Sequence, residues 1–101
     1  MHYQPKFTER FLEKIEVFRG TGEGKILVEL MRRVLADPIG SGQPGMLPGI
    51  RFGYSGIKPY YVSWIVCEEC FELLPAERQQ EPCAFCTERN QVIFISFYLS
   101  F

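Results

Sequence analysis

The sequence predicts an α+β domain in which a helical hairpin packs on one face of a small antiparallel β-sheet. Three observations predict this class. Two amphipathic stretches lie in the first half, strands rich in β-branched and aromatic residues fill the second half, and all four cysteines lie between the last two strands. A chain of 101 residues is expected to form one domain, with residues 67–90 as an insertion in its last hairpin.

The N-terminal segment predicts a strand followed by a helix. Residues 2–6 suit a short edge strand, because Pro5 has no N–H group to donate to a neighbouring strand. Thr8 is a typical N-cap, with a helix over about 9–19. Apolar residues at helical spacing form its apolar stripe: Phe11, Leu12, Ile15 and Phe18, with Phe7 and Leu12 at hydrophobic-staple positions.

A glycine-rich run, Gly20 to Lys25, follows this helix. It does not match a phosphate-binding loop, because Lys25 is followed by Ile26 and not by the Ser or Thr that binds magnesium. We therefore expect a turn between two helices. The apolar pattern of the second helix begins at Ile26 and stops at Asp37-Pro38.

The second half of the chain predicts three strands. Residues 39–49 are dense in Gly and Pro and indicate an ordered surface loop. Strand signals then follow at 50–54 and 60–66, and the last and most apolar strand is 91–101. The cysteines thus lie at the tip of the hairpin that the last two strands form.

The four cysteines form two CxxC pairs separated by twelve residues: Cys67, Cys70, Cys83 and Cys86. This spacing is typical of a structural zinc site, in which each pair lies on a tight turn and four thiolates surround the metal. All four tetrahedral positions would be taken by protein ligands, whereas a catalytic zinc keeps one position for water. We therefore expect the zinc to be structural.

The cellular compartment bears on the state of these thiols. No apolar run approaches the length of a membrane span, and residues 1–6 lack the features of a signal peptide, so we expect a cytoplasmic protein. A reducing cytosol favours metal binding over disulfides. Two disulfides in a secreted domain, or a redox-active CxxC, are the alternative interpretations.

Charge is distributed unevenly along the chain. Residues 1–66 hold nine Lys and Arg against six acidic residues, whereas residues 67–90 hold two against six. Because neutralisation of phosphates supplies most of the affinity for nucleic acid, a zinc finger that binds nucleic acid should be basic. The acidic cysteine segment is therefore interpreted as a structural staple or a protein-contact surface.

The predicted order of elements, strand, helix, helix, strand, strand, cysteine tip, strand, resembles the RelE/ParE superfamily of small bacterial and archaeal toxins, which act in toxin–antitoxin pairs. The stretches that carry the resemblance cover everything outside the cysteine tip: Tyr3-Gln4-Pro5-Lys6-Phe7-Thr8-Glu9-Arg10-Phe11-Leu12, residues 30–38 ending Leu35-Ala36-Asp37-Pro38, Met46-Leu47-Pro48-Gly49, the strands at 50–54 and 60–64, and Val92-Ile93-Phe94-Ile95-Ser96-Phe97.

The resemblance implies a set of site residues. Ribonuclease members of the family cleave mRNA in the ribosomal A site with Lys and Arg on the middle strands and an Arg near the end of the last strand. Arg51 matches one basic position, whereas Tyr61 and Ser100 stand where the family usually has arginines. Lys58 is the candidate replacement cation, and Tyr61 and Tyr98 are the candidate proton donors.

Two hypotheses follow from the resemblance. In the first, the protein is the toxin-like component of a type II toxin–antitoxin system and is an mRNA endonuclease, with an antitoxin, the ribosome and mRNA as partners. In the second, it is a non-catalytic, zinc-stabilised protein-interaction module of the same fold. The missing cations favour the second, because catalysis at phosphate depends on positive charge.

Overall fold

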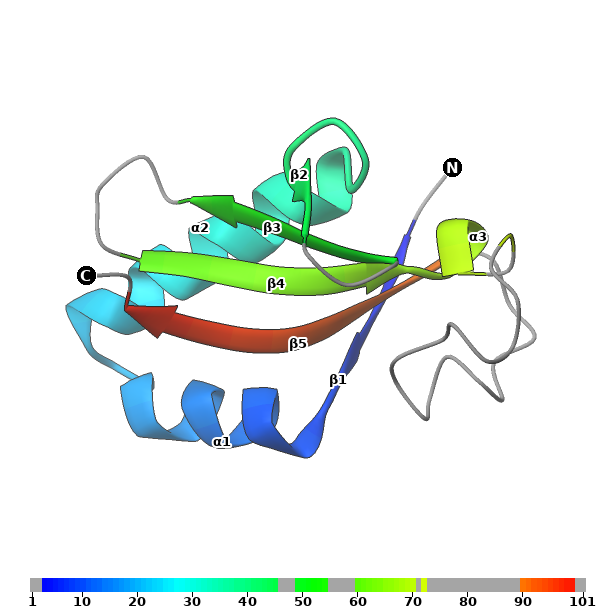
Figure 1. Cartoon of the computed structure of the whole chain (residues 1–101). Coiled ribbons are helices and arrows are strands. Elements are labelled where there is room, and N and C mark those ends of the chain that lie inside the picture. The colour runs from blue at the N-terminus through cyan, green and yellow to red at the C-terminus, as the bar shows by residue number, and fades with distance from the viewer. Residues whose placement is uncertain (1–2, 46–48, 55–59, 71, 73–89, 100–101) are drawn as a thin grey trace.

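The computed structural model describes residues 3–45, 49–54, 60–70, 72 and 90–99, and these form an α+β domain. Helices α1 (Glu9–Phe18) and α2 (Gly22–Ala36) pack together on one face of a five-stranded sheet (Figure 1). The predicted fold class is therefore confirmed. The predicted zinc-binding tip between the last two strands lies mostly outside the described residues.

The sheet has the strand order β1-β5-β4-β3-β2. Its strands are β1 (Gln4–Phe7), β2 (Gln43–Pro44), β3 (Ile50–Tyr54), β4 (Tyr60–Val66) and β5 (Gln91–Leu99). The neighbours from β2 to β5 are antiparallel, but β1 runs parallel to β5, so the sheet is mixed and not antiparallel throughout. The two strands are separated by most of the chain, and this long crossover permits the parallel direction.

The start of α1 follows its prediction closely. The side chain of Thr8 accepts a hydrogen bond from the backbone N–H of Phe11, which caps the helix. The staple contact differs from the prediction. Phe7 stacks on Phe11, with ring centroids 5.6 Å apart, while Leu12 is half exposed. Leu12 points away because Phe11, one position earlier, lies over β5 and contacts Phe94.

The glycine-rich run joins the two helices, as predicted, but α2 begins within it. Thr21 is the N-cap of α2, and its hydroxyl accepts from the N–H of Gly24, so the helix starts before Ile26. Gly20 has a φ of 76°, a left-handed conformation typical of the residue after a helix. At Gly24 a Cβ atom would overlap the carbonyl oxygen of Phe18, so the absence of a side chain lets the two helices meet closely.

The main core lies between the helices and the sheet. Buried residues from α1, α2, β4 and β5 form it: Phe11, Leu27, Leu30, Val34, Val62, Trp64, Val66, Val92, Phe94 and Phe97. A register shift in the β4–β5 pairing, between Ser63 and Trp64, lets both Phe94 and Phe97 face this core, although strict alternation would separate them. Phe97 then packs edge-to-face on Phe18 of α1.

Trp64 anchors the glycine- and proline-rich loop to the sheet. Its indole N–H donates to the carbonyl of Pro38 at 2.9 Å, and its ring lies where side chains on Gly42 and Gly53 would be. This segment, predicted as an ordered surface loop, includes the short strand β2, in which Gln43 and Pro44 pair with β3. Glycines at positions 42 and 53 therefore leave room for the outer edge of the Trp64 ring.

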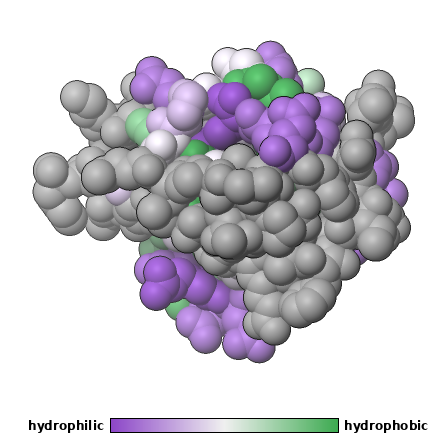
Figure 2. Space-filling model, turned by 45° about the vertical axis from the view of Figure 1, so that its right-hand side comes forward, coloured by the Kyte–Doolittle hydropathy of each residue, from purple (hydrophilic) through white to green (hydrophobic). Residues whose placement is uncertain are grey.

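No helix in the described part of the chain is long and apolar enough to cross a membrane. In the view of Figure 2, hydrophilic residues make up most of the coloured surface, and hydrophobic residues form small separate areas.

Gly24→Ala is expected to destabilise the fold by about 1–3 kcal/mol, because its new methyl group has no room beside the Phe18 carbonyl. Gly22→Ala is the matched control, since a Cβ at Gly22 meets no atom within 4 Å and helix propensity favours alanine. Urea unfolding of both variants measures the difference. Equal stability of the two would show that the helices do not need this close contact.

Candidate functional site

The first CxxC pair forms a single helical turn, α3 (Cys67–Cys70), directly after β4. Positions i and i+3 of a helix lie on the same face, so both thiols are presented to one side of the turn. Both are buried, in a second apolar cluster with Ile65 and Ile93, and Ile50 packs against it. The sequence predicts a tight turn here, and the structure gives that turn a helical form.

The donor chemistry of this pair fits a soft metal such as zinc, since two buried cysteine sulfurs lie on one face at ligand spacing. Cys83 and Cys86, the other predicted ligands, lie outside the described residues. Within the described ranges, no three or more potential metal ligands come together. The structure therefore describes half of the predicted ligand set.

Arg51 is held at the base of α3 by a bidentate ion pair with Glu69. Its Nε lies 2.6 Å from one carboxylate oxygen of Glu69 and its Nη2 lies 2.8 Å from the other. The third nitrogen, Nη1, donates to the carbonyls of Ile39 at 3.1 Å and Gly42 at 3.5 Å. The hydrogen bond to Glu69 raises the pKa of Arg51, which stays charged. All three guanidinium nitrogens thus have protein partners.

Glu68, the other acidic residue between the cysteines, is bound by the N-terminal segment. The hydroxyl of Tyr3 donates to its carboxylate at 2.6 Å. This hydrogen bond and burial raise the pKa of Tyr3 to about 12. The turn that carries Cys67 and Cys70 is therefore fixed from two directions, by Tyr3 next to β1 and by Arg51 on β3.

Among the predicted catalytic residues that the structure describes, Tyr61 and Tyr98 are neighbours across β4 and β5, whereas Arg51 lies on β3. Arg51 is opposite Trp64 in the β3–β4 pairing, and directly opposed residues share a sheet face. Tyr61 is three positions before Trp64 on β4, so the alternation of side chains places it on the other face. Its register partners are Tyr54 and Tyr98. Lys58, the remaining candidate, lies outside the described residues.

Sequence reasoning missed the acidic partners of this region. Glu68 and Glu69 lie between Cys67 and Cys70, and from the sequence they contributed only to the negative charge of residues 67–90. Their position within a CxxC turn signals that they lie next to the predicted metal ligands. Nothing in the sequence pairs them with Tyr3 or Arg51, which are 65 and 18 residues away.

Comparisons of the chain with models of protein families, with characterised proteins and with solved structures find no match.

The Arg51–Glu69 pair is expected to stabilise the fold far more than Arg19–Glu16, although the shortest N···O distances are 2.6 and 2.7 Å. The side chains are 15% and 29% exposed in the first pair and 71% and 68% exposed in the second. Glu69→Gln should cost about 1–2 kcal/mol of unfolding free energy, and Glu16→Gln less than about 0.5 kcal/mol. Urea unfolding checks both, and similar losses would contradict a structural role for the inner pair.

Proposed function

We propose that the protein is a toxin-like component of a type II toxin–antitoxin system, acting in the cytoplasm with an antitoxin as its partner. The observation that carries the proposal is the order of elements, apart from the two-residue strand β2: a strand, a helical hairpin on one sheet face, two antiparallel strands, a cysteine-bearing turn and a closing strand. This is the order on which the resemblance to the RelE/ParE superfamily rests.

The proposal includes a structural zinc ion bound by Cys67, Cys70, Cys83 and Cys86. The buried pair on α3 supports it, because the hydrogen bonds of Glu68 and Glu69 orient the turn independently of any metal. A turn oriented in advance loses less conformational entropy when its thiolates bind. The zinc would join α3 to the rest of the insertion and carry no catalytic step.

The purified protein should carry one zinc per chain in a native mass spectrum, and a strong chelator should remove the metal and lower the melting temperature. A mass measured after denaturation in acid serves as the control, since the metal is then lost. Cys67→Ser and Cys70→Ser should each reduce the bound zinc. Thiols that all react at once without release of metal would contradict this site.

An mRNA endonuclease activity is the more specific form of the proposal. It needs a cation at the scissile phosphate, and Arg51 is occupied by Glu69 and two carbonyls. It also needs a proton donor, and Tyr61 lies on the opposite sheet face from Arg51. These two observations favour the second candidate, a non-catalytic, zinc-stabilised module of the same fold that binds a protein partner.

Expression of the protein alone separates the two candidates. A toxin should arrest growth of the host, and an endonuclease should also produce cleaved ends in translated mRNA, mapped by primer extension. Tyr61→Phe removes only a hydroxyl and should slow cleavage by about 10²–10⁴-fold if that hydroxyl transfers a proton.

Arg51→Ala is less informative than Tyr61→Phe, because it also breaks the ion pair with Glu69. Tyr60→Phe is the control, because it removes a tyrosine hydroxyl from the opposite face of β4, where the hydroxyl donates to Glu23 at 3.4 Å. Normal growth and intact mRNA, at full accumulation of folded protein, would contradict the toxin proposal and leave the interaction module.

A further inference from the structure

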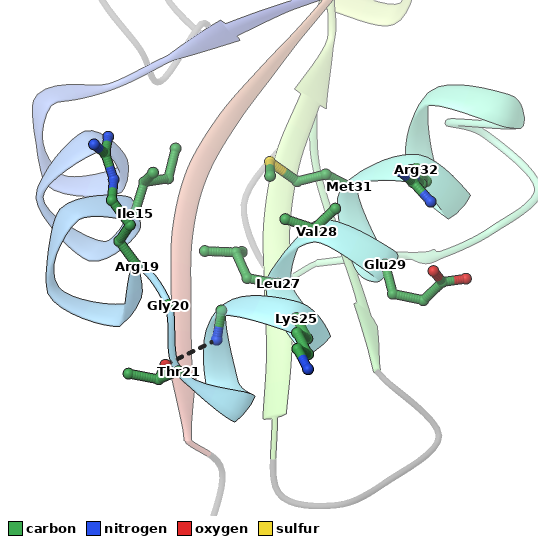
Figure 3. A pocket seen from close by; sticks show the side chains of 11 residues that line it. Ile15, Arg19, Gly20, Thr21, Lys25, Leu27, Val28, Glu29, Met31 and Arg32 are labelled. Atoms are coloured by element: carbon green, nitrogen blue, oxygen red, sulfur yellow. Dashed lines mark hydrogen bonds between the residues drawn. The ribbon is translucent and has the colours of Figure 1, made fainter.

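A groove of about 480 Å³ lies between α1 and α2, and none of its lining residues belongs to the site around α3 (Figure 3). Its apolar lining comes from both helices: Ile15, Leu27, Val28 and Met31. In the close-up, Ile15 on α1 and Leu27 and Met31 on α2 point toward one another across it. Val28 is 44% exposed, so part of this apolar lining faces solvent.

The groove exists because the helices meet closely at one end and diverge from there. Gly20 and Thr21 form the turn, and Gly24 allows α2 to approach the last turn of α1. These three residues line the groove where the two helices join. Beyond them α1 packs on β5 and α2 on β4, so the space between the helices widens over the sheet.

Charged residues around the groove are mostly basic. Arg19, Lys25 and Arg32 line it together with a single acidic residue, Glu29. Lys25 and Arg32 are exposed, and the pair between Arg19 and Glu16 is exposed on both sides. An exposed pair of this kind contributes little to stability, so Arg19 is able to exchange Glu16 for another acidic partner.

We propose that this groove binds an acidic amphipathic helix from a partner protein. The apolar lining fits a side-chain stripe at positions i, i+3, i+4 and i+7, and the basic rim fits Asp and Glu beside that stripe. RNA is disfavoured, because its phosphates would gain nothing from the apolar lining. The inference rests on the proposed function in one respect, since the antitoxin is the partner that would supply the helix.

A fluorescein-labelled helical peptide of about 18 residues, with Leu on one stripe and Glu on both flanks, is the probe for the purified full-length chain. Fluorescence anisotropy should show saturable binding. The double variant Lys25→Glu/Arg32→Glu should bind the peptide at least about tenfold more weakly. The matched control, Lys6→Glu/Arg10→Glu, has the same charge change at exposed positions outside the groove and should bind as the wild type does.

A second pair of variants tests the contribution of the apolar lining. Val28→Asp should weaken binding of the peptide, whereas Val17→Asp, at a residue that is 69% exposed and outside the groove, should not. A second peptide with Lys in place of Glu should bind the wild type poorly and the Lys25→Glu/Arg32→Glu variant better. Circular dichroism of each variant checks that the fold is retained.

Three results would overturn the proposal: no saturable binding of the acidic peptide, equal loss of binding in both double variants, or tighter binding of a single-stranded RNA oligonucleotide that depends on Lys25 and Arg32. The expression experiment is separate. Peptide binding without growth arrest would refute the toxin proposal and leave the groove, whereas growth arrest without peptide binding would refute the groove alone.

Discussion

Strand β5 is the element on which the rest of the structure depends. It pairs with β1 on one side and with β4 on the other, and so joins the two ends of the described chain in one sheet. One of its faces supplies Phe94 and Phe97 to the core under the helices, and the other supplies Ile93 to the cluster around the cysteines. Without this strand, both hydrophobic clusters would lose buried side chains that the other residues of the cluster pack against.

The contacts that hold α3 in place and the groove between α1 and α2 differ in how completely their polar groups are paired. At α3, the carboxylates of Glu68 and Glu69 are bound by Tyr3 and Arg51, and the thiols are buried in the cluster with Ile65 and Ile93. At the groove, Lys25 and Arg32 are exposed beside a partly exposed apolar lining. Paired groups resist movement, whereas exposed cations next to apolar surface favour an acidic partner. The pairing therefore gives the first region a role in stability, and the exposed cations are the basis for proposing partner binding at the second.

Most elements of the fold could be predicted from local patterns. Thr8 as an N-cap, the apolar stripe of α1, and the strands at 50–54 and 60–66 each depend on a few neighbouring residues. The start of α2 was missed because glycines indicate a turn, although Thr21 caps the helix within them. The cysteine spacing predicted two metal ligands on the turn that is α3, but the partners of its glutamates are distant in sequence and leave no local signal.

By itself, the sequence determined the α+β class, the order of the elements other than β2, and the position of the cysteine turn, because these follow from residue spacing along the chain. Only the tertiary structure decided that β1 runs parallel to β5 and that Arg51 binds Glu69. It also placed Arg51 and Tyr61 on opposite faces of the sheet. The physical reason is that strand direction, register and ion pairing depend on how distant segments meet, and a single register shift on β5 changes which side chains share a face.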